Sequence, residues 1–157
     1  MIKQRVLNFC FVFIIFLIDR FTKILIINFA EGNDEKNIFI TSFLNLNLIW
    51  NDGIAFGMFS FEEKTYYNFL TIIIILITIV IFWMILKSEK LEKFAFMMIF
   101  GGSLGNIFDR LYYASVPDFI DFHINNFHWF IFNVADIFIT IGVLLLIILE
   151  LFFKNKI

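Results

Sequence analysis

The chain contains 157 residues, of which 61% are hydrophobic and 25 are phenylalanine. Soluble domains average roughly 45–50% apolar residues, and a water-soluble fold of this size cannot bury the apolar surface that this composition provides. The formal net charge of −2 gives no basic surface for nucleic acid, and the single Cys10 excludes an intrachain disulfide framework. We therefore expect an integral membrane protein with one domain, residues 1–157.

Four apolar segments are long enough to cross a hydrocarbon core of about 30 Å, which requires roughly 20 helical residues. They are residues 6–29, 66–86, 94–111 and 130–153. Asp19, Arg20 and Lys23 interrupt the first segment, whereas the second carries no charge between Leu70 and Leu86. The predicted fold class is an all-α integral membrane protein with four transmembrane helices.

Basic residues gather on one side of the predicted spans. Two precede the first span, three join the second span to the third, and two follow the fourth. They are Lys3, Arg5, Lys87, Lys90, Lys93, Lys154 and Lys156. Short connections rich in Lys and Arg stay in the cytoplasm. We therefore expect both termini to face the cytoplasm.

The connection between the first two predicted spans, residues 30–65, is too long for a simple turn. Within it, Leu or Trp occupies every second position of residues 44–50, and this period of two is typical of a strand. Asn51, Asp52 and Gly53 then form a turn sequence. The pattern predicts a small β element on the outer membrane surface.

Three aspartates, each on a different predicted helix, lie at similar depths. An ionisable side chain inside a span costs roughly 2.5–3.5 kcal/mol, so each one requires a partner or a function. With a rise of about 1.5 Å per residue, Asp19, Asp109 and Asp136 lie roughly 20–22 Å from the inner face. The sequence therefore predicts that the three carboxylates converge.

Small and polar side chains share faces of the last two predicted helices. Gly105, Asn106 and Asp109 follow a helical spacing on the third helix, and Asn133 and Asp136 share a face of the fourth. A glycine permits close approach of a neighbouring helix or a substrate. Both faces are therefore candidates for a site between helices.

The connection between these two helices supplies two more carboxylates and both histidines. Asp118 and Asp121 lie at the outer boundary, and we interpret Asp121 as solvated or capping and His123 and His128 as interfacial. The two histidines alone make no metal site, and no Ser-His-Asp set or Cys-His pair is placed to act. We therefore expect no metal and no cofactor.

Carboxylates are the groups that remain to carry a reaction. Two carboxylates held close together share one proton, so that one activates water while the other protonates a carbonyl oxygen, as in an aspartic protease. Buried charges also serve as ion pairs between helices or as a transport path. A non-enzymatic carrier or scaffold therefore stays open, although a carrier more often shows two repeated halves and none is evident here.

Five short motifs, in order along the chain, resemble those of lipoprotein signal peptidases. They match D-x-x-[ST]-K, N-x-G-x-A-F, GG-x-x-GN-x-x-DR, V-x-D-F and FN-x-AD at residues 19–23, 51–56, 101–110, 116–119 and 132–136. Each motif alone is weak evidence, but the ordered set covers essentially the whole chain. Arg20 stands where the first motif usually has Gln.

The resemblance implies an aspartic endopeptidase that cleaves prolipoproteins immediately before a cysteine carrying diacylglycerol. Asp118 and Asp136 match the catalytic pair of the family. The positions matching substrate-binding or supporting residues are Asn51, Asn106, Arg110, Asn133, Asp19, Lys23, Asp109 and Gly105. The family also has a small β-cradle on the outer surface, consistent with the predicted strand.

The resemblance also implies partners and a location. The expected partners are prolipoprotein substrates bearing diacylglyceryl-cysteine and membrane lipid, with no nucleic acid, and the protein is expected to be a monomer. The expected location is the bacterial cytoplasmic membrane, with the active site near its outer face.

Overall fold

The computed structural model describes residues 2–32, 37–53, 64–125 and 127–153, which form four helices and four strands. In chain order they are α1 (Ile2–Gly32), β1 (Asn37–Thr41), β2 (Leu44–Asn51), α2 (Lys64–Lys87), α3 (Lys90–Tyr113), β3 (Val116–Ile124), β4 (Phe127–Phe132) and α4 (Val134–Phe153). All four predicted helices are present, each longer than or close to its predicted range.

The start of the last helix differs from the prediction. Residues 130–132, which were expected inside the fourth span, belong to β4, and α4 begins at Val134. The sequence there is apolar on both sides of the boundary, so hydropathy alone does not separate the strand from the helix that follows. The consequence is that Asp136 lies in the first turn of α4 rather than six residues after the start of the helix.

The four strands form one antiparallel sheet in the order β1-β2-β3-β4. The alternation of residues 44–50 predicted β2 correctly, and the sheet as a whole is larger than the single strand expected. In β3 the first four residues are all buried, so the period of two that reveals a half-exposed strand is missing. The pairing of Asn51 with Val116 places the end of β2 beside the start of β3.

Helices α3 and α4 approach closely because small residues line their contact. A Cβ atom at Gly102 would lie 2.5 Å from the backbone oxygen of Ala135, and one at Gly142 would lie 2.6 Å from Ile99 Cγ1. Small residues allow this approach where helices pack in lipid. At its other end α3 stops at Ala114, whose left-handed conformation (φ 56°) ends the helix and leads into β3.

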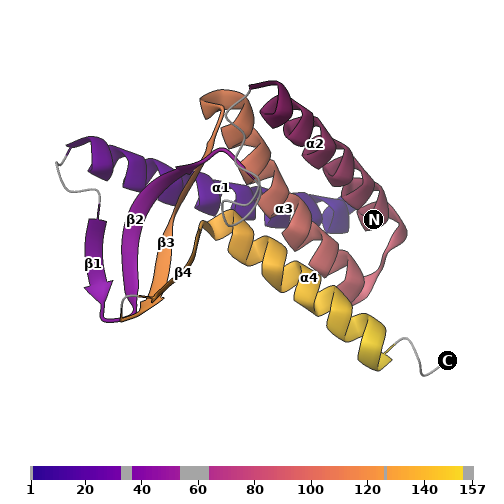
Figure 1. The fold of residues 1–157 in the computed structure, drawn as a ribbon. Coiled ribbons are helices and arrows are strands. Elements are labelled where there is room, and N and C mark those ends of the chain that lie inside the picture. Colours follow the sequence, from indigo (N-terminus) through magenta and orange to yellow (C-terminus); the bar gives the residue numbers. More distant parts are fainter. Residues whose placement is uncertain (1, 33–36, 54–63, 126, 154–157) are drawn as a thin grey trace.

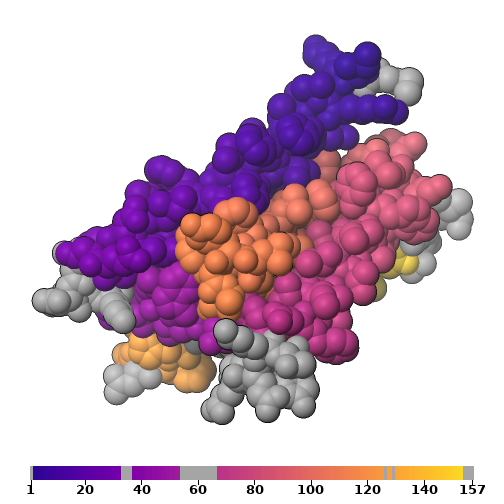
Figure 2. Space-filling model, turned by 90° about the horizontal axis from the view of Figure 1, so that it is seen from above, coloured from indigo at the N-terminus to yellow at the C-terminus, as the bar shows by residue number. Residues whose placement is uncertain are grey.

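The sheet lies at one end of the helical layer (Figure 1). The first turns of α1, the α2–α3 connection and the last turns of α4 all lie on the side away from the sheet. Figure 2 shows α1 running along one edge of the molecule, with its first half extending past the other helices. The chain segments that we expect in the cytoplasm, because they are rich in Lys and Arg, therefore lie on one side of the fold.

Two helices of the described chain are long and apolar enough to cross a membrane by length and composition, over Tyr67–Lys87 and Val134–Phe153. Helices α1 and α3 are as long, but each carries buried charged residues. Large apolar side chains cover the exposed faces, for example Leu76 and Trp83 of α2, each 57% exposed, and Phe152 of α4, 66% exposed. Such a surface suits a hydrocarbon surrounding.

Candidate active site

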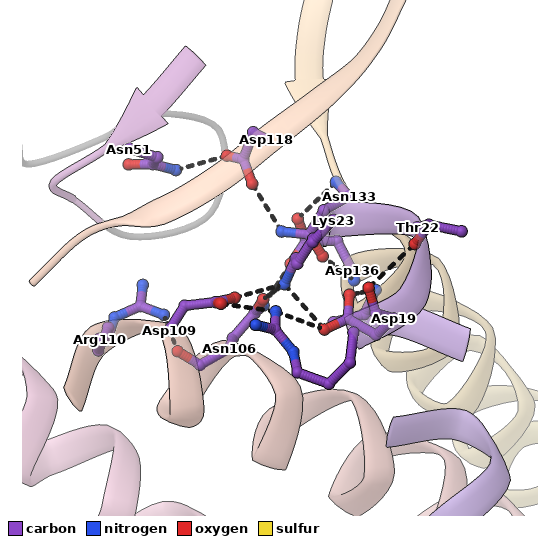
Figure 3. Close-up of polar contacts among 12 residues, drawn as sticks. Asp19, Thr22, Lys23, Asn51, Asn106, Asp109, Arg110, Asp118, Asn133 and Asp136 are labelled. Atoms are coloured by element: carbon purple, nitrogen blue, oxygen red, sulfur yellow. Dashed lines mark hydrogen bonds and ion pairs between the residues drawn. The ribbon is translucent and has the colours of Figure 1, made fainter. Parts of the chain in front are cut away.

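Asp118 lies near the start of β3 and is buried. Each of its carboxylate oxygens accepts a hydrogen bond from an asparagine side chain. Asn51 Nδ2, at the end of β2, donates to Oδ2 over 2.8 Å, and Asn133 Nδ2 donates to Oδ1 over 2.6 Å. The carboxylate is therefore fixed from both sides by neutral donors (Figure 3).

Asp136 lies in the first turn of α4, where the helix N-terminus favours negative charge. Its Oδ1 accepts a hydrogen bond from Asn106 Nδ2 of α3 over 2.8 Å, and its Oδ2 accepts one from the backbone N of Asn133 over 3.2 Å. In return, the backbone N of Asp136 donates to Asn133 Oδ1 over 3.1 Å. This reciprocal pair is a capping box in which Asn133 is the cap residue.

Asn133 therefore contacts both carboxylates. Its side-chain nitrogen binds Asp118, its side-chain oxygen caps α4, and its backbone nitrogen binds Asp136. The expectation that Asn133 and Asp136 share a helical face is wrong, because Asn133 precedes the helix. What brings the two residues together is capping geometry, which the three-residue spacing fits equally well.

Burial and charge change the acidity of Asp118. Removal from water and the neighbouring Asp136 carboxylate together raise the pKa of Asp118 to about 7, against the lowering effect of the donors Asn51 and Asn133. A carboxyl group with this pKa retains its proton close to neutral pH. One protonated and one ionised carboxyl is the state that an aspartic dyad requires.

Lys23 connects α1 to this site through Asn106. It is fully buried, and its Nζ donates to Asp19 Oδ2 (2.9 Å), Asn106 Oδ1 (2.8 Å) and Asp109 Oδ2 (2.7 Å). All three protons of the ammonium group therefore have acceptors. Because Lys23 occupies Oδ1 of Asn106, the amide nitrogen of Asn106 points to Asp136.

The two aspartates that pair with Lys23 also make contacts between helices. Asp19 Oδ1 accepts a hydrogen bond from the backbone N of Ala135 over 3.0 Å, which ties α1 to the first turn of α4. Arg20 forms an ion pair with Asp109 at 2.5 Å and lies over the ring of Phe108. The buried cluster therefore contains two carboxylates and two cations, the balance that buried charges require.

Arg110 extends from the last turn of α3 toward the loop after β2. Its Nη2 donates to the backbone oxygen of Gly53 over 2.9 Å, and its Nη1 donates to the backbone oxygen of Asn106 over 3.2 Å. The backbone N of Gly53 in turn donates to Asn51 Oδ1 over 2.8 Å. The predicted turn at residues 51–53 is present, while residues 54–56 of the same motif lie outside the described residues.

Gly105 is required for the contact between α1 and α3. A Cβ atom at this position would collide with the Asp19 carboxylate. The site residues expected from the sequence are therefore all found in one connected region, and the predicted convergence of Asp19, Asp109 and Asp136 is present through Lys23 and Asn106.

The two candidate catalytic carboxylates face a cavity of about 370 Å³. Its polar end contains both carboxylates together with the asparagines that bind them and Arg110. Its apolar end lies between α2 and α4 and is lined by Ile74, Ile139, Val143 and Leu144. A polar reacting end joined to an apolar slot suits a peptide that carries a hydrocarbon group.

Asp121 differs from its prediction. Instead of being solvated, its side chain is buried, with both oxygens within 3.0 Å of His128 Nδ1. The reason is that β3 pairs with β4 here and covers a position that was assigned to an open loop. This pair is not among the hydrogen-bonded neighbours of Asp118 and Asp136.

Comparison with known proteins identifies the family. The family profile described as signal peptidase (SPase) II matches residues 11–153. The chain is 52% identical to a lipoprotein signal peptidase of Pelagibacter ubique, covering 99% of this chain and 93% of that protein. The chain belongs to the signal peptidase II family. It is also 39% identical to a lipoprotein signal peptidase of Francisella tularensis subsp. novicida, covering 99% and 98%.

A solved structure described as a bacterial membrane enzyme has the same fold as this peptidase. The TM-score is 0.78 at 31% identity, covering 96% of this chain and 91% of that one. The peptidase is a bacterial membrane enzyme that removes signal peptides from prolipoproteins, and its aspartic mechanism follows from the family. The resemblance stated from the five motifs is confirmed, and the carrier and scaffold alternatives fall away.

Proposed function

We propose that Asp118 and Asp136 are the catalytic dyad of this signal peptidase. The observation that carries the proposal is the position of Asn133, which binds both carboxylates at the polar end of the cavity. The raised pKa of Asp118 supports a single proton shared by the pair. Both groups are buried, so bulk water does not compete for their hydrogen bonds.

The reaction follows from one proton on the pair. The ionised carboxylate takes a proton from a water molecule, whose oxygen attacks the scissile carbonyl carbon, while the protonated carboxyl gives its proton to the carbonyl oxygen. The tetrahedral intermediate then breaks its C–N bond as the proton taken from water moves to the leaving nitrogen, while the hydroxyl formed from the carbonyl oxygen returns its proton to the other carboxylate and restores the dyad. The cysteine that carries diacylglycerol leaves with the new amino terminus.

The surrounding residues hold the dyad in place or meet the substrate. Asn51, Asn106 and Asn133 donate to the two carboxylates and fix the direction of their free lone pairs. Arg110 lines the cavity, where its guanidinium group can donate a hydrogen bond to a carbonyl oxygen of the substrate. The supporting residues on α1 and α3, which keep Asn106 oriented and the helices together, are Asp19, Lys23, Asp109 and Gly105.

The apolar slot between α2 and α4 is where we place the diacylglyceryl chains. Ile74, Val143 and Leu144 form its walls, and Val143 and Leu144 are exposed on the surface of α4. Binding of the chains there supplies affinity at a distance from the reacting carbonyl. The site is complete within one copy of the described chain, in keeping with a monomer.

The whole chain acts as one membrane-embedded peptidase domain with four spanning helices. Both termini face the cytoplasm, because the first turns of α1 and the α2–α3 connection lie away from the sheet, and Lys3, Arg5, Lys87, Lys90 and Lys93 belong to these parts of the chain. The sheet, the dyad and the polar end of the cavity then lie near the outer face of the cytoplasmic membrane. The scissile bond, held close to the lipid-bearing cysteine, lies at the same level.

The direct test is cleavage of a diacylglyceryl-modified prolipoprotein by the detergent-purified enzyme and by its Asp118→Asn and Asp136→Asn variants. We expect each variant to lose at least 10³-fold in kcat, since neither can hold the dyad proton as an acid or base. Glu92→Gln, which alters an exposed carboxylate in the first turn of α3 outside the site, is the control and keeps its activity. Cleavage that survives in a folded dyad variant removes that residue from the mechanism.

A further inference from the structure

A second cluster of titratable side chains lies at the far end of the β3–β4 hairpin. His123 of β3 pairs with His128 of β4, and their rings stack with centroids 5.1 Å apart. Asp121 of β3 completes the cluster. One ligand-type atom from each of the three residues lies within 4.8 Å of the other two.

The cluster is partly buried, and one of its polar atoms has no hydrogen-bond partner among the described residues. The Asp121 side chain is 2% exposed and contacts His128 Nδ1 with both carboxylate oxygens, at 3.0 and 2.9 Å. His123 Nδ1 is buried and has no hydrogen-bond partner within the described part of the chain. Buried polar atoms normally have a hydrogen-bond partner, so the Nδ1 atom of His123 is available for a ligand.

We propose that Asp121, His123 and His128 bind a divalent transition-metal ion of the zinc class. Imidazole nitrogens and a carboxylate oxygen are ligands that zinc prefers, and three protein ligands leave one position for water. Bonds of about 2.0–2.1 Å in a tetrahedral site bring ligand atoms roughly 3.4 Å apart, so small side-chain rotations close the cluster. His128, whose side chain is 53% exposed, gives the ion access from solvent.

The site has a structural consequence for the peptidase. The bound ion joins β3 to β4 near the turn of the hairpin, while Asp118 lies nearer the start of β3 and Asn133 follows directly after β4. The strands that the ion holds together therefore position both Asp118, on β3, and Asn133, directly after β4. Two histidines alone make no metal site, which is why none was expected from the sequence; the buried Asp121 supplies the third donor.

The experiment is a calorimetric titration of zinc chloride into the metal-free full-length enzyme in detergent, purified without a polyhistidine tag. We expect one zinc ion per chain. His123→Gln and His128→Gln should each weaken the zinc affinity at least tenfold. Cys10→Ser and Asp136→Asn, which alter other zinc-capable groups outside the cluster, should leave the affinity unchanged. Absence of stoichiometric binding to the wild-type enzyme overturns the proposal, as does unchanged affinity in a folded variant that combines His123→Gln with His128→Gln.

A second measurement needs no variant. Cobalt bound to the wild-type enzyme in place of zinc should give the intense visible absorption of a four-coordinate ion and should be displaced by one equivalent of zinc. The weak spectrum of a six-coordinate ion, or cobalt that zinc does not displace, contradicts the assignment.

Discussion

At the scale of single residues, Asn133 decides the geometry of the site. It makes three different hydrogen bonds with three different atoms: one holds Asp118, one caps α4 and one holds Asp136. A serine at this position also caps a helix but cannot reach as far as the asparagine amide. The capping role and the carboxylate-binding role are therefore separable by substitution.

We expect Asn133→Ser to fold nearly as well as the wild type and to cleave roughly 10- to 100-fold more slowly, because a buried carboxyl oxygen that loses its donor costs about 1–3 kcal/mol. Asn133→Ala should show the same decrease in cleavage rate. It should also lower the free energy of unfolding by about 1 kcal/mol, because alanine cannot cap α4. Thermal unfolding and kcat/KM, measured side by side, separate the two effects. Wild-type turnover by Asn133→Ser means that the bond to Asp118 has no catalytic importance.

At the scale of elements, the dyad depends on how closely α3 and α4 pack. Asn106 reaches Asp136 only because the two helices approach at Gly102 and Gly142. The obstacle to a larger residue at Gly102 is a backbone oxygen, that of Ala135, which cannot rotate away. Overpacking of this kind costs about 1–3 kcal/mol.

Gly102→Ala is therefore expected to lower the unfolding temperature and to reduce cleavage, because the first turn of α4 moves away from Asn106. Gly32→Ala is the control: within the described residues, and apart from its chain neighbours and its own helix backbone, no atom lies within 4 Å of a Cβ placed there, so its stability and activity should match the wild type. The measurement is thermal unfolding in detergent with the cleavage rate of each variant. A Gly102→Ala enzyme as stable and active as the control contradicts the packing argument.

The elements also show what the sequence can predict. Long apolar runs predicted all four helices, and alternation predicted β2. Strands β3 and β4 were missed because their residues are apolar or buried without alternation, so nothing distinguished them from a loop and the start of a helix. The motif spacing located Asn133 and Asp136, but the cap that joins them depends on where the helix begins, which periodicity does not fix.

At the scale of the whole molecule, a connected set of side chains links α1 to α4. Lys23 joins Asp19 to Asn106, and Asn106 joins Asp136, so the first helix supports a carboxylate more than a hundred positions along the chain. Depth estimates predicted that these aspartates converge. They could not predict which atoms meet, since that depends on rotation of each helix about its axis.

The proposed orientation of the molecule is tested by labelling in intact cells, with native Cys10 replaced by serine. An impermeant maleimide should label Ser42→Cys, in the exposed turn between β1 and β2, and should not label Glu89→Cys, in the exposed α2–α3 connection, until the membrane is opened. Labelling of Glu89→Cys from outside reverses the assignment of the two faces.

The central claim, that Asp118 and Asp136 act with one shared proton, is tested most directly by the pH dependence of kcat/KM. Burial and the neighbouring carboxylate raise the pKa of Asp118 to about 7, so the dyad keeps its proton below that pH and loses it above. We predict that kcat/KM falls about tenfold per unit as pH rises beyond about 7. A rate that stays level or increases up to about pH 9 contradicts a shared proton.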